Sequence, residues 1–274
     1  HMDIAASIQE VTEEIMIRIT RSISSEYKIK NLCLAGGVAL NCVANGKIKR
    51  NGFFENIWVQ PASGDAGGAL GAALLLWHNE LGNIRKVKEG DSMKGSYLGP
   101  TYDNETIEQT LKNIGASYKI LDNDKLIEFS ANALSKGKII GWFQGRMEFG
   151  PRALGNRSII ADPSSEIMQK NLNLKVKYRE SFRPFAPSIL VDYVNDWFDL
   201  DSESPYMQLV YDVKENKRIK MTEDEQKLFG IEKLNIKRST IPAVTHVDYS
   251  ARIQTVHKET NPIYYNLISK FKEL

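Results

Sequence analysis

The chain has 274 residues, of which 42% are hydrophobic and 26% are charged, and its formal net charge is +2. This length exceeds the usual domain size of about 100–200 residues, so the sequence predicts one large or two modest globular domains. The small charge by itself gives no argument for nucleic acid or an acidic membrane as a partner. No apolar run approaches the roughly 20 residues of a membrane span, and no signal-peptide pattern opens the chain. We therefore expect a cytoplasmic protein.

The two cysteines, Cys33 and Cys42, lie in hydrophobic segments without CxxC spacing or histidine neighbours. We expect them to be reduced, buried thiols. The first two residues, His1 and Met2, are typical of a cloning remnant, and a helical pattern follows them at once. We therefore expect the chain to start inside a longer gene.

The first segment alternates predicted helices and strands. Apolar residues from Ile4 to Ile19 recur at helical spacing, which predicts an amphipathic helix over residues 3–24. Predicted strands at Asn31–Leu34 and at residues 56–61 each run into a glycine loop and then a helix. This order predicts an α/β unit with both glycine loops at one edge of the sheet.

The two glycine loops read LAGGVALN and PASGDAGGALGAA. Glycine between a strand and a helix lets backbone N–H groups approach a phosphate, and the helix dipole favours the same anion. Glycine is also common at tight turns that bind nothing, so a structural role stays open for each loop. Asp65, in the second loop, is either a metal ligand or a cap of the following helix.

Residues 81–100 are polar and glycine-rich, and we place a linker there. Strands with flanking helices follow, which predicts an α+β second domain. The predicted helices cover residues 104–114, 123–136 and 165–172, and the predicted strands cover residues 118–121, 138–143, 187–191 and 206–213. Residues 240–256 are rich in β-branched residues. A charged segment over residues 214–237 is expected to be a solvated excursion.

A basic motif, GWFQGRMEFGPRALGNRSIIADP, covers residues 141–163 and holds three arginines among glycines and prolines. Between residues 145 and 183, eight basic residues stand against four acidic ones. Guanidinium groups match phosphate geometry with paired N–H donors. Close cations on rigid turns repel one another by about 4 kcal/mol per pair unless an anion lies among them. The motif therefore predicts a site for a dianion, and a solvated charged face is the alternative.

A second basic stretch, LNLKVKYRESFRPFAPS, follows. Lys175 and Lys177 alternate with apolar residues, which predicts that both lie on one face of a strand. Pro184 and Pro187 restrict the chain after Arg183. Nucleic-acid binding is a further alternative, because aromatic residues interleaved with cations can stack on bases. We expect core packing for at least four of these aromatic residues, which are Trp142, Phe143, Phe149, Tyr178, Phe182 and Phe185.

Both segments carry motifs of one known family. LCLAGGVALNCVANGKI and PASGDAGGALGAAL resemble the end of the nucleotide-binding domain of the NodU/TobZ/CmcH carbamoyltransferases, a Kae1-like domain of the actin-like ATPase superfamily. Both basic motifs, followed by SPYM and IPAVTHVDYSARIQTV, resemble in order and spacing the YrdC-like C-terminal domain of that family. The resemblance implies a Kae1-like piece over residues 1–85 and a YrdC-like α+β domain over residues 86–274.

The resemblance implies an ATP-dependent O-carbamoyltransferase. In the family, the YrdC-like domain binds carbamoyl phosphate and ATP and forms a carbamoyl-adenylate with release of pyrophosphate. The Kae1-like domain then passes the carbamoyl group to a hydroxyl of an antibiotic, sugar or lipo-oligosaccharide. A divalent metal, iron or magnesium, is implied in the full-length enzyme. A YrdC-type enzyme of tRNA threonylcarbamoyl modification and a non-catalytic binding module are the alternatives.

The resemblance also implies roles for individual residues. The cations expected around carbamoyl phosphate are Arg152, Lys177, Arg183 and Arg252. Weaker candidates on the first basic motif are Gln144, Arg146, Glu148 and Arg157. The expected phosphate or nucleotide contacts are Gly36, Gly37 and Asn41, and the expected metal ligand is Asp65. His246 and Asp248 either orient the nucleotide or satisfy a strand end.

Two features of the family pattern are missing from this sequence. The histidine metal ligands of the family lie earlier in the gene, and a strand with an Asn-Thr-Ser run follows the helix that corresponds to NPIYYNLISKFKEL. We therefore expect no complete metal site here. We also expect weak binding of carbamoyl phosphate or nucleotide without complete carbamoyl transfer.

Overall fold

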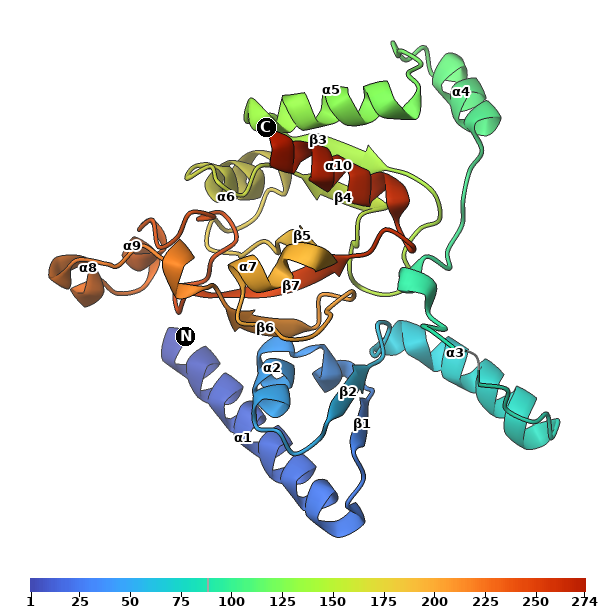
Figure 1. Cartoon of the computed structure of the whole chain (residues 1–274), viewed down its shortest axis with the longest axis vertical. Helices are drawn as coiled ribbons and strands as arrows, with labels where there is room; N and C mark the ends of the chain where they lie inside the picture. Colours follow the sequence, from blue (N-terminus) through green and yellow to red (C-terminus); the bar gives the residue numbers. More distant parts are fainter. Residues whose placement is uncertain (88) are drawn as a thin grey trace. The chain divides into compact units, whose positions relative to one another are not determined.

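The structure, a computed structural model, describes residues 1–87 and 89–274. The chain divides into two compact units (Figure 1). The first unit comprises His1–Ser92, Phe149–Arg152 and Met207–Val210. The second comprises Met93–Glu148, Ala153–Tyr206 and Tyr211–Leu274. Among the helices described, none combines the length and the apolar composition that crossing a bilayer requires.

The first unit is built from helices and two paired strands. Its elements are α1 (Met2–Tyr27), β1 (Asn31–Leu34), the 3₁₀ turn η1 (Gly37–Leu40), α2 (Cys42–Arg50), β2 (Asn56–Val59), α3 (Asp65–Leu75) and the π-helical turn η2 (Leu76–Glu80). β1 and β2 pair in parallel, with Leu32 opposite Ile57. Both predicted strands and the helix between them are confirmed.

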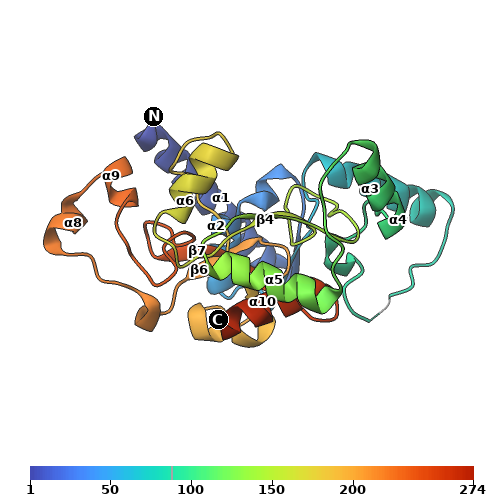
Figure 2. The same ribbon diagram turned by 90° about the horizontal axis from the view of Figure 1, so that it is seen from above.

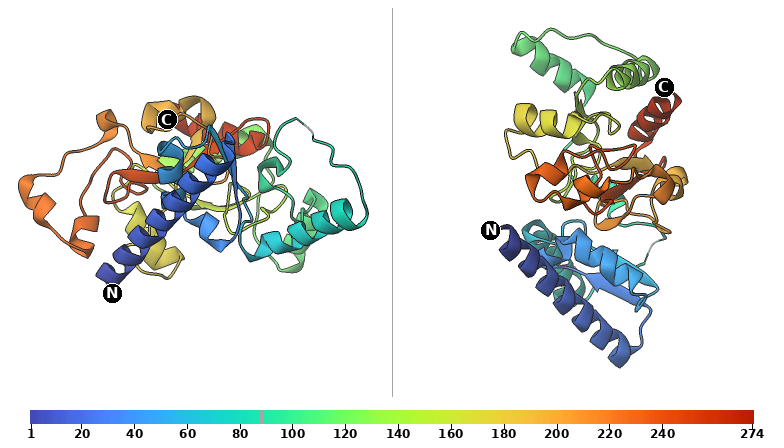
Figure 3. Two further views of the ribbon diagram at one scale, coloured as in Figure 1. Left: turned by 90° about the horizontal axis from the view of Figure 1, so that it is seen from below. Right: turned by 90° about the vertical axis from the view of Figure 1, so that its left-hand side faces the viewer.

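The predicted amphipathic helix is confirmed as α1, which lies against the rest of the first unit (Figure 3, dark blue). Met16 and Ile17 of α1 pack on a core of Leu32, Ile48 and Phe54. The apolar stripe that predicted the helix is exposed in this chain; it comprises Ile4, Ile8, Val11, Ile15 and Ile19. The periodicity therefore predicts the helix correctly but does not mark the face that is buried here.

The prediction of buried thiols is wrong for Cys33, which is exposed, whereas Cys42 is partly buried. Side chains alternate along a strand, and Leu32 of β1 points into the core. Cys33 therefore points to the opposite, exposed face of β1.

The rest of the chain has short strands and many short helices. These elements are η3 (Lys94–Ser96), α4 (Asn104–Asn113), α5 (Asn123–Ser135), β3 (Ile140–Phe143), β4 (Arg157–Ile160), α6 (Met168–Asn171), η4 (Leu172–Val176), β5 (Ser188–Leu190), η5 (Val191–Tyr193), α7 (Val194–Trp197), β6 (Leu209–Asp212), η6 (Glu215–Lys217), α8 (Glu223–Lys227), α9 (Ile231–Leu234), β7 (Ser250–Val256) and α10 (Pro262–Glu273). Small sheets and separate helices confirm the α+β class.

Two small sheets and a helix pair organise the second unit. β3 and β4 are antiparallel, and the other sheet has the strand order β5-β7-β6, with β5 and β7 parallel. Helices α5 and α10 lie side by side (Figures 1 and 2) and share a buried cluster. The cluster comprises Ala131, Leu134, Trp142, Val256, Tyr264 and Leu267. It anchors the end of β7 to the last helix.

Two further predictions for the second segment need correction. Residues 118–121 form no strand, because none of the described strands pairs with this segment. Ile120 is 76% exposed. The basic motif contains a strand that its sequence did not predict, since β4 depends on pairing with β3. The charged segment over residues 214–237 contains the short helices α8 and α9.

Candidate functional site

The second basic stretch forms a helical turn. The π-helical η4 covers Leu172–Val176, and the backbone N–H of Lys177 donates to Leu172 O at 2.8 Å. The predicted strand face of Lys175 and Lys177 is therefore wrong, because this segment closes its hydrogen bonds within itself. Both lysines are exposed. We call residues 172–183 the basic loop.

One buried asparagine holds the basic loop. The side chain of Asn173 donates from Nδ2 to Ser181 O at 3.1 Å and to Arg183 O at 2.9 Å. Its Oδ1 accepts from Arg179 Nε at 2.6 Å. Tyr178, at the tip, has a left-handed backbone (φ 49°) and is 86% exposed. Lys177 and Arg183 are therefore carried by one loop whose two ends meet at Asn173.

Arg183 makes an exposed ion pair with Glu180, with 2.8 Å between Nε and Oε2. The backbone N–H of Glu180, and then the Arg183 side chain, hold the pKa of the Glu180 carboxyl below its ordinary value. Solvent screens such a pair, and about half of each side chain is exposed. Arg183 thus stays accessible to a stronger anion.

Exposed aromatic side chains accompany the cations. Phe143, Tyr178 and Phe182 are exposed, whereas Trp142 is buried. The prediction that at least four of six aromatic residues pack in the core is therefore wrong. Phe185 is partly buried against the core next to the basic loop, and the Arg179 guanidinium lies 4.9 Å from its ring centroid.

A small core joins the basic loop to the segment before β7. Met168 and Leu172 pack against Ala243. The Ala243 N–H donates to Pro163 O at 3.2 Å. Leu172, at the base of the basic loop, therefore packs against a residue that lies three positions before His246 in the sequence.

Residues 246–250, which we call the His246 turn, form a tight polar turn at the start of β7. The His246 N–H donates to Ser250 O at 2.8 Å, and the Tyr249 N–H donates to His246 O at 3.1 Å. Asp248 Oδ1 accepts from the Ser250 N–H at 3.1 Å and from Ser250 Oγ at 2.6 Å. His246 Nδ1 lies 3.0 Å from Ser250 Oγ.

The charges around this turn favour neutral histidine and ionised aspartate. Burial lowers the pKa of His246, Asp248 opposes that shift, and Arg252 and Arg238 reinforce it. Burial raises the pKa of Asp248, but hydrogen bonds from Ser250 and the attraction of His246 bring it below its ordinary value. Arg252, half-buried on β7, is therefore close enough to His246 to act on it electrostatically.

The first basic motif forms the arginine loop, residues 144–157, of which 149–152 belong to the first unit. Glu148 is only 6% exposed. Its Oε1 accepts backbone N–H groups of Leu154 at 2.7 Å, Asn156 at 2.9 Å and Arg157 at 3.2 Å. Three donors on one buried carboxylate oxygen make Glu148 the centre on which the loop closes.

Arg157 is also occupied by the arginine loop. It donates from Nη1 to Gln144 O at 2.6 Å and from Nη2 to Gly145 O at 3.1 Å. Its guanidinium stacks 3.5 Å from the centroid of Phe143. Arg146 is exposed and donates to Gly99 O at 3.1 Å. Apart from a 3.5 Å hydrogen bond from Nη2 to Pro100 O, the observed contacts of Arg157 lie within the loop and its own strand pair.

Asn261, which sequence reasoning did not single out, completes this network. Its Oδ1 accepts from Gln144 Nε2 at 2.9 Å, and its Nδ2 donates to Asn156 Oδ1 at 2.8 Å and to Tyr97 OH at 2.9 Å. Burial raises the pKa of Tyr97 to about 12, the Asn261 hydrogen bond opposes this, and Glu148 adds to it. The signal for Asn261 was its place before Pro262, typical of a helix N-cap.

The two glycine loops of the first unit are bonded to each other. The Gly36 N–H donates to Ser63 O at 2.8 Å, and Gly36 has φ 96°, a conformation that favours glycine. Gly37 begins η1. Ser63 is buried, and its Oγ has no hydrogen-bond partner. The loops therefore meet, as expected for the carboxyl ends of two parallel strands.

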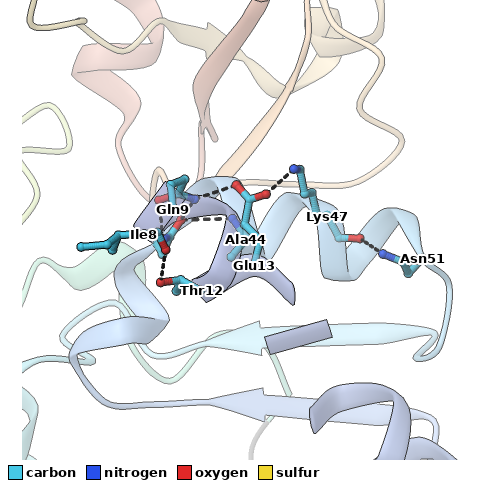
Figure 4. Close-up of polar contacts among 8 residues, drawn as sticks. Ile8, Gln9, Thr12, Glu13, Ala44, Lys47 and Asn51 are labelled. Carbon is cyan, nitrogen blue, oxygen red and sulfur yellow. Dashed lines mark hydrogen bonds and ion pairs between the residues drawn. The ribbon is translucent and has the colours of Figure 1, made fainter. Parts of the chain in front are cut away.

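Asn41, a predicted nucleotide contact, uses its amide inside the first unit. Its Oδ1 caps α2 by accepting the Ala44 N–H at 3.1 Å, and its Nδ2 donates to Gln9 Oε1 at 2.9 Å. Gln9 also donates to Glu13, which pairs with Lys47, and Figure 4 shows these adjoining contacts. These contacts tie α1 to α2.

Asp65 is the first residue of α3 and is exposed. The capping alternative is wrong, because Gly64 is the N-cap and no side chain caps this end. A carboxylate in the first turn still favours the helix dipole. Over residues 1–87 and 89–274, no three His, Cys, Asp or Glu side chains gather as a metal site.

Arg152 belongs to the first unit. Its Nη2 donates to Leu40 O at 3.3 Å, and its buried Nε has no hydrogen-bond partner among the residues that the structure describes. Arg152 thus adjoins the end of η1. The structure brings Lys177 and Arg183 onto one loop and His246 close to Arg252, and the convergence of Arg152 with them stays a prediction.

The comparisons with known proteins now identify the family. A family model described as carbamoyltransferase C-terminus matches residues 131–274, and one described as carbamoyltransferase N-terminus matches residues 1–74. The chain belongs to the carbamoyltransferase family. These matches cover both the glycine loops and the basic motifs.

Several relatives of this carbamoyltransferase chain match along most of its length. An uncharacterized Synechocystis protein, sll1178, is 59% identical over 100% of this chain and 45% of its own length. Nodulation protein NolO of Bradyrhizobium diazoefficiens is 40% identical over 100% of this chain and 46% of its own. The 3'-hydroxymethylcephem-O-carbamoyltransferase of Streptomyces clavuligerus is 32% identical over 88% of this chain and 40% of its own length. The chain thus spans less than half the length of these relatives.

Proposed function

We propose that this chain is part of an ATP-dependent O-carbamoyltransferase. The complete protein hydrolyses carbamoyl phosphate to carbamate and inorganic phosphate and joins the carbamate to the α-phosphate of ATP as carbamoyl-adenylate, with release of pyrophosphate. It then passes the carbamoyl group to a hydroxyl acceptor with release of AMP. The observation that carries this proposal is the basic loop, which presents Lys177 and Arg183 from one buried Asn173 in a chain of the carbamoyltransferase family. A relative named for O-carbamoyl transfer to a hydroxymethyl group supports the hydroxyl acceptor.

The chemistry needs positively charged side chains that can contact the two reactants. Carbamoyl phosphate and ATP are both anionic and repel each other, so fixed positive charge must bring them together and stabilise the departing phosphates. Lys177 is exposed, and Arg183 gives up only a screened ion pair with Glu180. Arg252, half-buried on β7, is the further cation that the family resemblance implies for the site. Positioning on a fixed loop lowers the entropic cost of reaction.

We assign the remaining candidates by what their side chains contact. Glu148, Gln144 and Arg157 build the arginine loop, since their polar atoms bond within it. Arg152, with its partnerless Nε next to Leu40, is the fourth cation of the proposal and serves an anion near η1. Arg146 remains a weaker candidate at the loop surface.

The first unit supplies the nucleotide side of the proposal, as a Kae1-like piece over residues 1–85. The backbone of Gly36 and Gly37 is the proposed phosphate contact, and Asn41 supports that loop by capping α2. Exposed Asp65 is the one metal ligand that we propose from this chain. Because no metal-ligand group of three forms among the described residues, ligands from elsewhere in the complete protein must complete a metal site. Residues 86–274 form the proposed YrdC-like domain.

Calorimetric titration of the chain with carbamoyl phosphate tests the binding step. We expect saturable heat, and we expect Arg252→Gln to weaken affinity by about tenfold, since a charge-assisted hydrogen bond contributes about 1.5–3 kcal/mol. Lys258→Gln, a nearby surface cation outside the proposed site, is the matched control and should bind as the parent does. Absence of heat, or equal losses in both variants, would contradict the proposal.

The family match favours carbamoyl transfer over tRNA threonylcarbamoyl modification. RNA binding would depend steeply on salt, because phosphate contacts release counterions. A titration of the chain with tRNA at two salt concentrations separates the two functions. Tight, salt-sensitive tRNA binding without carbamoyl phosphate binding would support the RNA alternative.

A further inference from the structure

The His246 turn fixes which nitrogen of the imidazole carries the proton. Ser250 Oγ lies 2.6 Å from Asp248 Oδ1, and an ionised carboxylate only accepts, so the Ser250 hydroxyl proton points to Asp248. The same oxygen lies 3.0 Å from His246 Nδ1 and has only lone pairs left to offer. Nδ1 therefore donates to Ser250, and Nε2 of the neutral ring is unprotonated.

The groups that face the ring keep it neutral. Arg252 on β7 and Arg238, whose Nε donates to His246 O at 3.2 Å, both disfavour a charged imidazolium. Asp248, on the turn itself, favours the charged ring but is outweighed by these cations and by burial. Across the described part of the chain, no group makes a hydrogen bond to Nε2, and the residue is only partly buried. His246 is thus an unused hydrogen-bond acceptor next to a cation.

The backbone of the turn is strained in a way that holds this arrangement. Tyr249 has φ 65°, and the left-handed region costs a non-glycine residue about 1–2 kcal/mol. Two backbone hydrogen bonds across the turn, His246 N–H to Ser250 O and Tyr249 N–H to His246 O, hold it there. Strain retained at a polar turn indicates a functional constraint on the side chains that it carries.

A hydrogen-bond acceptor at His246 Nε2 complements the amino group of carbamoyl phosphate. The cations of the proposed site, Lys177, Arg183 and Arg252, are donors only, and they satisfy phosphate and carbonyl oxygens. The amino group of carbamoyl phosphate is its one neutral hydrogen-bond donor and needs an acceptor when it leaves water. A carboxylate would accept but would repel the phosphate dianion. A neutral imidazole nitrogen accepts without that repulsion.

We propose that His246 recognises the amide of carbamoyl phosphate, accepting one of its N–H groups at Nε2 while Arg252 and the basic loop hold the phosphate. This inference rests on the proposed function. Its consequence is selectivity against acyl phosphates that carry a methyl group in place of the amino group. Asp248 and Ser250 act as positioning residues, since they set the tautomer of His246.

Two ligands of nearly the same shape test this role. Calorimetric titration of the chain with carbamoyl phosphate and with acetyl phosphate gives two affinities, and we expect a preference of about tenfold for carbamoyl phosphate. His246→Phe should remove that preference by weakening carbamoyl phosphate alone, whereas His246→Gln, which keeps an acceptor, should retain part of it. A purely structural role of His246 would move both affinities together and leave their ratio unchanged.

The pH dependence of the ratio is a second readout on the parent chain. As the pH falls through the lowered pKa of His246, Nε2 gains a proton and can no longer accept, so the preference for carbamoyl phosphate should disappear. Acetyl phosphate corrects for titration of the phosphate and of the cations. This readout needs no variant and stands even where a His246 variant does not fold.

The outcomes separate this inference from the proposed function. Binding of both phosphates with equal affinity, or an unchanged ratio in a folded His246→Phe chain, overturns the role of His246 and leaves the proposed function standing. Loss of ATP affinity alone in His246→Phe assigns Nε2 to a nucleotide hydroxyl and also overturns it. Binding of neither phosphate by the parent chain overturns both.

Discussion

The arginine loop and the basic loop look alike in sequence but use their polar groups differently. In the arginine loop, Glu148 accepts three backbone N–H groups and Arg157 donates to carbonyl oxygens of the loop itself. In the basic loop, buried Asn173 makes the structural contacts and leaves Lys177 exposed. The difference teaches that a cluster of cations divides into groups that build the fold and groups that remain available for a ligand.

Among substitutions that test this difference between the loops, we expect the largest loss of stability at Glu148. Glu148→Ala leaves three buried N–H donors without an acceptor, so we expect the free energy of unfolding to fall by about 4 kcal/mol. Denaturant unfolding followed by circular dichroism measures this. Glu166→Ala, which removes only the exposed pair with Lys237, is the matched control and should cost less than about 1 kcal/mol. Equal costs would show that Glu148 is not the centre of its loop.

A smaller loss of stability is expected for a substitution at Gly155 of the same loop. This glycine has φ +103°, and an added Cβ would lie 2.4 Å from Cδ1 of the buried Tyr264 ring. Gly155→Ala should therefore cost about 3 kcal/mol, from backbone strain and overpacking together. Gly115→Ala, at φ +66° with nothing within 4 Å of the added carbon, isolates the backbone part. If both substitutions lower the melting temperature equally, the contact with Tyr264 contributes nothing.

The closed network also predicts a decline in stability at alkaline pH. Burial raises the pKa of Tyr97 in the folded chain to about 12, above its ordinary value of 10.0. The stability that it contributes is complete below pH 10 and is lost as the pH rises towards 12, up to about 2 kcal/mol. The free energy of unfolding, measured against pH, should decline less steeply in Tyr97→Phe than in the parent chain. Tyr27→Phe, at an exposed site on α1, should keep the decline of the parent.

The smallest effect on stability is expected in the basic loop. Arg183→Gln removes only an exposed pair with Glu180, so the melting temperature should stay within the scatter of exposed substitutions. The same variant should bind carbamoyl phosphate more weakly than the parent. A large fall in melting temperature would place Arg183 among the residues that build the fold.

The helices and strands that local pattern controls could be predicted from the sequence. α4 and α5 begin after Asp103 and Asp122, whose side chains cap them, and β1 and β2 precede glycine loops. The helical form of the basic loop could not be predicted, because alternation of Lys175 and Lys177 with apolar residues suits a strand equally well. In the structure the segment closes its hydrogen bonds within itself and Asn173 is buried, and neither can be read from that alternation.

Which of the candidate side chains bond within the fold was likewise beyond the sequence. Gln144, Glu148 and Arg157 carry the same donors and acceptors whether they bond to a ligand or to the chain. The partner of Gln144, Asn261, lies 117 positions away, and the loop partners of Glu148 and Arg157 come within reach only once the loop has folded. The family resemblance marked these motifs as the candidate site, whereas the hydrogen bonds indicate which of their side chains bond within the fold.

A side-by-side titration of two variants with carbamoyl phosphate tests the central claim most directly. Lys177→Gln removes an exposed cation of the basic loop, and Arg157→Gln removes a cation that bonds to its own loop. Our account predicts that Lys177→Gln weakens carbamoyl phosphate binding by about tenfold at an unchanged melting temperature, and that folded Arg157→Gln binds within about twofold of the parent. The reverse order of affinities would contradict it.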